Sequence, residues 1–344
     1  MEAVLNKLGK QSAFHIGELS EIASARRAGN ELARRLGFDE VRTGQVALVI
    51  TEAATNIVKH AREGEILLRS LEADGKAGVE IVALDRGPGM ANFALRMKDG
   101  ISTAGTYGVG MGAIRRMSQE FDVYSGEGQG TVLLMIIWSD GVCPPAPVWQ
   151  VGAVCLPVAG EDLCGDAWDM GVGRNGVTIC AADGLGHGPD AARASDPAVH
   201  LASERPDLSP TSLMALAHEA LRGTRGAAMA IAVIDEQENM RNFVGVGNIA
   251  GCIFLADGAR RHLMSHNGIV GSNLRKVQEL VHDWQSGAML ILHSDGIATR
   301  WDLENYTGLI FRHPTLIAAV LYRDFARQRD DAMVVVVREQ DGRT

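Results

Sequence analysis

Hydrophobic and polar positions along the first half of the chain follow helical and strand periods in turn. Apolar residues recur every four positions in residues 25–37, which predicts a helix. A second helix is predicted from Thr43, whose hydroxyl suits an N-cap, to His60. Residues 65–73 and 78–85 then read as a strand hairpin around an ADGK turn. Further on, the pattern predicts a helix at 111–120 and strands at 121–125 and 130–138.

Short apolar strands dominate the second half. They are predicted at residues 151–158, 177–182, 228–235, 243–255, 289–293 and 333–338. Helices are predicted at residues 189–203, 209–221 and 314–328. Strands interrupted by only a few helices are typical of an α+β layered domain.

Between the halves lies SDGVCPPAPVWQ, in which prolines withhold backbone donors and favour an extended, semi-rigid chain. A length of 344 residues is enough for two domains that each bury a core. We therefore predict a first domain at residues 1–139, a Pro-rich linker at 140–150 and a second domain at 151–344.

Composition narrows the classes of function. The 33 basic and 42 acidic side chains give a net charge of −9, which argues against broad binding to nucleic acid or anionic membranes. The start of the chain lacks the pattern of a signal peptide, and the longest apolar runs, at 132–138 and 333–337, are far shorter than the ~20 residues that span a bilayer. Five cysteines without a CxxC pair indicate reduced thiols. We expect a cytoplasmic protein with neither nucleic-acid nor membrane partners.

Glycine is in excess, with 40 residues, about 12% against a typical ~7%. Gly105, Gly108, Gly110 and Gly112 precede a predicted helix, where free backbone N–H groups can cradle phosphates. A glycine loop of this kind is by itself weak evidence for a phosphate site. It follows no first strand as a Rossmann loop would, and GK[ST] is absent, which excludes a Walker loop.

Two further features of the first half fit a nucleotide. Glu52 and Asn56 lie four residues apart, hence on one helix face; the Asn oxygen suits Mg²⁺, and the Glu can accept a proton from a hydroxyl. Asp85 ends a strand in DRGPGM, where it can accept a hydrogen bond from an exocyclic amine such as that of adenine while Gly87 and Gly89 let the backbone approach the base. Singly these are a solvated helix face and a turn. Their combination and order favour a nucleotide site.

TEAATN, DRGPGM and GVGMGAIRRMSQEFDVYSGEGQGT resemble the N, G1 and G2 boxes of the GHKL ATPase/kinase superfamily, and Gly130-Thr131 resembles its G3 element. The short form is most similar to RsbT-like anti-sigma-factor serine kinases. The resemblance covers about residues 25–138 and implies a Bergerat α/β sandwich that binds ATP. It also implies Mg²⁺ through Asn56, adenine recognition by Asp85 and Glu52 as the base. A sensor histidine kinase is the close competitor, but no phosphoacceptor helix pair precedes the boxes, and His15 reads as structural.

Aspartates of the second half lie at strand ends or beside glycine: Asp166, Asp183, Asp295 and the pair Asp330-Asp331. Asp-Gly alone is a common turn dipeptide. Together, however, carboxylates that converge repel one another unless cations neutralise them, and oxygen-only ligands favour Mg²⁺ or Mn²⁺ over zinc. We therefore predict a divalent-metal site that can activate water on a phosphoryl group.

This set resembles the PPM-type serine/threonine phosphatases, with an α-β-β-α layered fold, in the SpoIIE-like branch, and DGLGHGPDAA is close to RsbX-like members. The likeness covers about residues 151–339 and implies ligand roles for Asp166, Asp183, Asp295 and Asp330, with Gly184 contributing its carbonyl. Whether Asp330 or Asp331 is the last ligand is open. Met333 stands where the family often has Thr, and Asn248 is a further candidate.

A kinase-like and a phosphatase domain on one chain imply opposed chemistry on a phosphorylated switch. By resemblance, the substrate is a serine or threonine of a STAS-type antagonist or scaffold protein, with an anti-sigma factor or another signalling protein downstream. The alternative is a phosphatase whose first domain holds ATP only as a non-catalytic binding or regulatory module.

Overall fold

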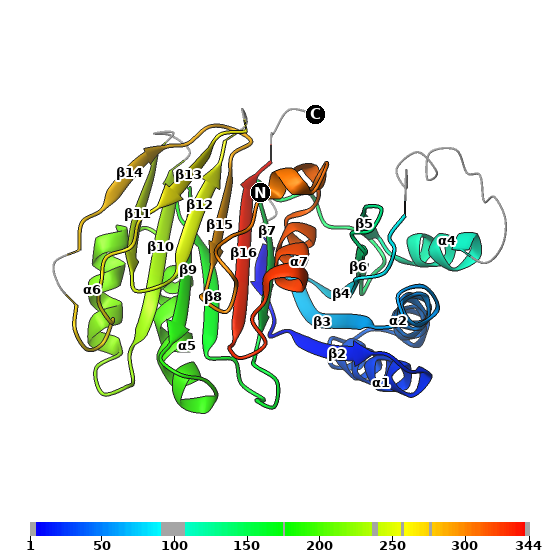
Figure 1. Cartoon of the computed structure of the whole chain (residues 1–344). Helices are drawn as coiled ribbons and strands as arrows, with labels where there is room; N and C mark the ends of the chain where they lie inside the picture. Colours follow the sequence, from blue (N-terminus) through cyan, green and yellow to red (C-terminus); the bar gives the residue numbers. More distant parts are fainter. Residues whose placement is uncertain are drawn as a thin grey trace. The chain divides into compact units, whose positions relative to one another are not determined.

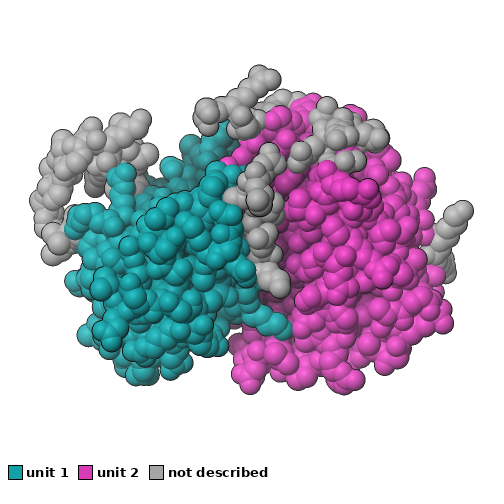
Figure 2. Space-filling view, turned by 180° about the vertical axis from the view of Figure 1, so that it is seen from behind, with its two compact units in different colours: residues 1–147, 302–323 teal, residues 148–301, 324–344 magenta. Residues whose placement is uncertain are grey.

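The computed structural model describes residues 5–90, 107–174, 176–235, 240–255, 258–274 and 277–340. The chain divides into two compact units, and each is made of two separate stretches of the sequence (Figure 2). Unit 1 comprises residues 1–147 and 302–323, and unit 2 comprises residues 148–301 and 324–344. Among the helices in the described ranges, none is both long and apolar enough to cross a membrane.

Unit 1 is built on a six-stranded antiparallel sheet in the order β1-β3-β4-β6-β5, with β2 also paired to β3 (Figure 1). Its strands are β1 (Leu5–Leu8), β2 (Ser12–Ile16), β3 (Gly64–Ala73), β4 (Lys76–Asp85), β5 (Glu120–Ser125) and β6 (Thr131–Trp138). Helices α1 (Leu19–Arg35), α2 (Glu40–His60) and α4 (Tyr107–Met117) supply side chains to a core on one face of the sheet. The predicted hairpin is therefore confirmed as β3 and β4.

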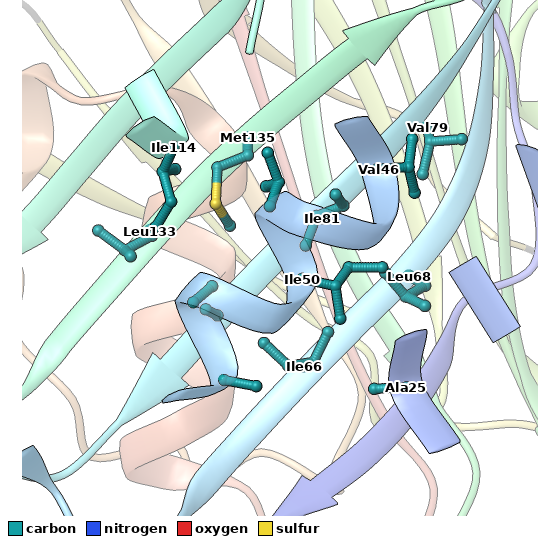
Figure 3. Close-up of a cluster of buried hydrophobic side chains, with 14 of the residues drawn as sticks. Ala25, Val46, Ile50, Ile66, Leu68, Val79, Ile81, Ile114, Leu133 and Met135 are labelled. Atoms are coloured by element: carbon teal, nitrogen blue, oxygen red, sulfur yellow. The ribbon is translucent and has the colours of Figure 1, made fainter. Parts of the chain in front are cut away.

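The core of unit 1 lies between this sheet and its helices. Val46 and Ile50 of α2 belong to the same buried cluster as Ile66, Ile81 and Met135 of three neighbouring strands, and all five are fully buried (Figure 3). Side chains alternate between the two faces of the sheet along each strand, so every second side chain packs against the helices.

Both predicted helix starts in this region are wrong by a few residues. Asp39, not Thr43, caps α2: its carboxylate accepts a hydrogen bond from the Arg42 N–H at 2.6 Å, while Thr43 is buried in the first turn. α1 begins at Leu19, behind a capping box made by Glu18 and Glu21. The capping residues set where α1 and α2 begin, because they satisfy the free N–H groups of the first turn.

The opposite face of the same sheet binds a segment from much later in the chain. Residues 302–323 contain η1 (Leu303–Asn305), η2 (Leu309–Phe311) and most of α7 (Pro314–Phe325), which lies beside β3 and β4 (Figure 1). Thr315 donates to Glu80 of β4 at 3.3 Å, and the His313 N–H donates to Asp122 of β5 at 2.9 Å. The sequence predicted these residues in the second domain. They group with unit 1 because their partners lie on its sheet.

Unit 2 contains two five-stranded antiparallel sheets, in the orders β14-β11-β10-β9-β8 and β13-β12-β15-β16-β7. The first is covered by α5 (Pro189–Glu204) and α6 (Pro210–Ala220). The strands are β7 (Trp149–Leu156), β8 (Asp166–Val172), β9 (Gly176–Gly184), β10 (Ala227–Asp235), β11 (Met240–Val246), β12 (Ala250–Phe254), β13 (Arg260–Leu263), β14 (Leu280–Asp283), β15 (Met289–His293) and β16 (Ala332–Glu339).

The single strand predicted at residues 243–255 is wrong, since it is two strands. Gly247, with φ of +89°, breaks it, and β11 and β12 then join different sheets. A continuous apolar run does not reveal such a change of sheet, because both halves of the run are buried.

Candidate functional sites

A pocket in unit 1 opens between α2, β4, β6 and the turn after β4. It encloses about 420 Å³, including space open to solvent. Four residues predicted from sequence line it: Asn56, Asp85, Gly89 and Thr131. The remaining lining residues are mostly apolar: Ala53, Ile57, His60, Ala83, Pro88, Met90, Met111 and Leu133. An apolar pocket with a few polar groups is the usual form of a site for a small-molecule ligand.

Asp85 is held in place by backbone donors. Its Oδ1 accepts hydrogen bonds from the Gly87 N–H at 2.8 Å and the Thr131 N–H at 3.2 Å. Within the described part of the chain, no hydrogen bond to Oδ2 is found, which leaves this oxygen able to accept one from a ligand. Burial raises the pKa of the Asp85 carboxyl, which the two N–H donors partly offset.

The turns beside Asp85 require glycine at two positions. Gly89 has φ of +67°, and a Cβ there would collide with the Gly126 carbonyl. Gly130 has φ of +69°, and a Cβ there would collide with the Asp85 carbonyl. The G1 and G3 elements thus approach each other backbone to backbone, which no larger residue allows.

The predicted glycine loop is partly a helix. Gly108, Gly110 and Gly112 lie within α4, which begins at Tyr107, and Gly105 lies outside the described residues. Burial of Met111 and Ile114 in the core accounts for the helix continuing through its glycines. The expectation that the helix starts at residue 111 is therefore wrong, since it starts four residues earlier, at Tyr107.

Gly110 brings α4 against the predicted catalytic face of α2. A Cβ on Gly110 would lie 2.7 Å from Glu52 Oε2 and 3.9 Å from Asn56 Oδ1. Asn56 lines the pocket, whereas Glu52 is not among its lining residues. The two side chains predicted to share a face do so, but only Asn56 faces the pocket wall.

The acidic residues of unit 2 interact across strand ends. Asp166 opens β8 and pairs in register with Asp183 near the end of β9. Asp166 is 4% exposed; burial, then the charge of Asp183, raises its pKa well above the usual range. Burial and then the charges of Asp295, Asp330 and Asp331 raise the pKa of Asp183 to about 7. The negative charges of the predicted carboxylates therefore raise the pKa of their neighbours.

Two polar residues orient these carboxylates. The Ser294 hydroxyl donates to Asp166 Oδ2 at 2.6 Å and accepts from the Met333 N–H at 3.1 Å. The Asn248 amide donates to Asp295 Oδ2 at 2.7 Å. Sequence reasoning missed Ser294, although a Ser directly before the Asp295-Gly296 strand end was the available signal.

The neighbouring Asp330 and Asp331 differ in their surroundings. Asp331 is 3% exposed, and its two carboxylate oxygens accept from the Val158 N–H and the Gly165 N–H, both at 2.7 Å. Asp330 is exposed, and burial followed by the charge of Asp295 raises its pKa. Asp331 therefore braces two loops, and Asp330 is the carboxylate that faces solvent.

The donor chemistry fits a divalent cation. Among the described residues, no three His, Cys, Asp or Glu side chains converge as a ready metal cage, so the full ligand set stays a prediction. The buried acids that raise one another's pKa are nonetheless the environment that a cation would neutralise. Gly184 ends β9, and a Cβ there would collide with the Ala191 carbonyl, which keeps its backbone close to α5.

Comparison with known proteins follows the division of the sequence. The family model for the histidine kinase-like ATPase domain matches residues 17–137. The serine/threonine-protein kinase RsbT of Bacillus subtilis (strain 168) is 35% identical over 131 residues, covering 38% of this chain and 98% of RsbT. Through its first half, the chain belongs to the histidine kinase-like ATPase family. The GHKL fold expected for unit 1 is confirmed.

The second half resembles phosphatases. The family model for stage II sporulation protein E matches residues 173–340. Phosphoserine phosphatase RsbX of Bacillus subtilis (strain 168) is 23% identical over 138 residues, covering 40% of this chain and 69% of RsbX. A crystal structure of RsbX in complex with magnesium superposes with a TM-score of 0.50 at 21% identity, covering 56% of this chain and 96% of RsbX. The chain thus joins an RsbT-like domain to a SpoIIE-type PPM domain.

Proposed function

We propose that this chain is a partner-switching regulator with two opposed activities. The SpoIIE-type domain is a Mg²⁺- or Mn²⁺-dependent phosphoserine/phosphothreonine protein phosphatase, and the RsbT-like domain is an ATP-dependent serine kinase. Both act on a STAS-type protein. The observation that carries the phosphatase half is geometric: Asp166 pairs in register with Asp183 at strand ends, and hydrogen bonds from Ser294 and Asn248 orient Asp166 and Asp295.

The phosphatase site would hold its cations through Asp166, Asp183, Asp295, Asp330 and the Gly184 carbonyl. When bound, divalent metal supplies an activated water and neutralises charge on the phosphoryl group. The chain's own residues hold the ligands still: Ser294 fixes one oxygen of Asp166, and Asn248 fixes one oxygen of Asp295. Asp331 ties the strand end to the loops at Val158 and Gly165.

For the kinase, the pocket supports recognition of adenine by Asp85 Oδ2, which its two backbone donors leave unoccupied. Asn56 would contribute its side-chain oxygen to Mg²⁺ beside the phosphates. Glu52 would accept the proton of the serine hydroxyl as the phosphoryl group leaves ATP. The likeness to RsbT, a serine/threonine-protein kinase, supports this assignment.

The test is incubation with a panel of STAS domains, followed by mass spectrometry. With ATP and Mg²⁺, one serine or threonine of a cognate domain should gain phosphate. The same site, phosphorylated in advance, should lose it when Mn²⁺ is added without ATP. Asp183→Asn should abolish the loss and preserve the gain. Phosphate removal unchanged by Asp183→Asn would contradict the phosphatase assignment.

A second candidate for unit 1 is a non-catalytic module that binds ATP as a conformational ligand. It is favoured by the position of Glu52, which is not among the residues that line the pocket. Glu52→Gln distinguishes the two. A kinase should lose transfer with its affinity for an ATP analogue intact, whereas a binding module shows no transfer in either protein.

A further inference from the structure

The segment at residues 302–323 belongs to one domain by sequence and to the other unit by its contacts. It falls inside the stretch that matches the SpoIIE model, yet it is part of unit 1. Its contacts are made with strand residues that alternate with the core of unit 1: Glu65, Glu80, Asp122 and Tyr124. The segment therefore completes the ATP-binding unit from the sequence of the phosphatase.

The last residue of this segment lies directly behind the nucleotide pocket. Arg323 is 3% exposed, and its Nη1 donates to the Asp85 carbonyl at 3.0 Å. The same nitrogen would be 2.9 Å from a Cβ on Gly130. Arg323 thus holds the backbone of Asp85, the predicted adenine acceptor, and lies against Gly130, the residue before Thr131.

Beyond Arg323, the next residues of the chain form hydrogen bonds within unit 2, next to two of the predicted metal ligands. Phe325, at the end of α7, accepts at its carbonyl from the Ala298 N–H at 2.9 Å. The Arg327 N–H donates to the Gly296 carbonyl at 2.7 Å, one residue from Asp295. Asp330 follows three residues later. A short, hydrogen-bonded stretch thus joins the backbone behind Asp85 to both Asp295 and Asp330.

We propose that nucleotide occupancy of the Asp85 pocket and phosphatase activity are coupled through α7, with Arg323 as the positioning residue. The inference rests on the proposed function of both sites. A ligand that engages Asp85 and Thr131 changes the backbone that Arg323 holds. Because Arg323 is buried and lies in the last turn of the packed helix α7, the change is passed along residues 324–330 to the carboxylates. Coupling between two binding sites is reciprocal, so metal at the carboxylates also changes nucleotide affinity.

The experiment uses the full chain and two separate readouts. Affinity for a fluorescent ATP analogue reports the pocket, and hydrolysis of p-nitrophenyl phosphate at fixed free Mn²⁺ reports the phosphatase. Saturating non-hydrolysable ATP analogue should change the hydrolysis rate of the wild type by about fivefold or more. A guanosine analogue at the same concentration controls for chelation of the metal.

Arg323→Met keeps the side-chain stem and removes the donor, so its hydrolysis rate should no longer respond to nucleotide. Arg323→Lys restores a donor and should recover part of the response. Arg312→Ala is the matched control: Arg312 lies in the same segment but pairs with Asp122 at 3.2 Å, and this variant should respond as the wild type does. Hydrogen exchange of residues 316–331 in the wild type, slowed by nucleotide, supports the proposal even where Arg323→Met fails to fold.

A wild type that binds nucleotide and hydrolyses phosphate, but shows neither a rate response nor altered exchange, overturns the coupling. A full response in folded Arg323→Met overturns the role of Arg323. A chain that lacks nucleotide binding or hydrolysis contradicts the proposed function itself, and the coupling with it; the two readouts show which half has failed.

Discussion

At the scale of single residues, the adjacent carboxylates of Asp330 and Asp331 differ in their surroundings. Asp331 uses both oxygens on backbone N–H groups, while Asp330, one residue earlier, is exposed. Sequence reasoning located the pair but left the last ligand open, because two adjacent aspartates look alike until their partners are known. The backbone donors of Val158 and Gly165 come from about 170 residues away and leave no local signal.

Asp331→Asn should lower the free energy of unfolding in metal-free buffer by about 1–3 kcal/mol, since an amide NH₂ then faces a backbone donor. Asp330→Asn should change it by no more than about 0.5 kcal/mol. Urea unfolding measures both values. For phosphatase activity we expect Asp330→Asn to lower the rate by about tenfold or more, with a weaker response to Mn²⁺. A stability loss confined to Asp330→Asn would reverse these assignments.

Gly110→Ala should weaken nucleotide binding without lowering the stability of the fold. Alanine in a helix favours folding by up to ~1 kcal/mol over glycine, but the new Cβ would press on Glu52 Oε2. We expect weaker binding of a fluorescent ATP analogue, by about tenfold, without loss of thermal stability. Gly44→Ala in α2, where a Cβ meets nothing within 4 Å, serves as the control and should bind normally. Equal affinity in both variants would remove Gly110 from the site.

At the scale of elements, the second face of the unit 1 sheet is partly charged. Arg69 and Glu80 form a buried pair, with 2.7 Å between Nε and Oε1 and 3.0 Å between Nη2 and Oε2, and Thr315 donates to the same carboxylate. A buried pair of this kind costs little while both partners are present and much when one is lost.

Glu80→Ala should therefore destabilise the chain by about 3–5 kcal/mol, because Arg69 keeps its charge without a partner. Lys76→Ala, which removes the partly exposed pair of Lys76, at the start of β4, with Asp140, should cost about 1 kcal/mol or less. Thermal and urea unfolding check the difference. Similar costs for both would show that the buried pair is not acting as an ion pair.

Elements with a strong period were predicted well. The β3–β4 hairpin, the strand β6 and the helices α5 and α6 came out within a few residues. The failures have physical causes: a cap at Asp39 ahead of the periodic stretch, a helix through glycines and a strand broken at Gly247. Among site residues, Asn56, Asp85, Gly89 and Thr131 meet in one pocket as predicted, because box motifs carry their own spacing.

At the scale of the whole molecule, the units do not follow the order of the sequence. The Pro-rich linker at residues 140–150 predicts a clean division, but residues 302–323 pack in unit 1. No local pattern reveals this, since α7 is apolar nearly all round and would read the same in either unit.

Cleavage within the linker should therefore not release unit 1. With a protease site inserted after Pro145, the fragment that begins there still carries residues 302–323, whose partners lie on the other fragment. We expect the two pieces to elute together from a size-exclusion column in native buffer and to separate in denaturant. A second site inserted after Trp301 and a third after Asp324 should release the pieces. Separation after the first cut alone would contradict the assignment of this segment.

The placement of α7 also bears on how such a chain arises. Two genes joined end to end, one for an ATPase-type domain and one for a phosphatase-type domain, can be separated again at the linker without loss. Once a helix encoded by the second gene packs on one face of the first protein's sheet, a split at the linker deprives one product of part of its fold. The fusion would then be difficult to reverse. Shortened descendants should either lose both domains or keep residues 302–323 together with the first domain.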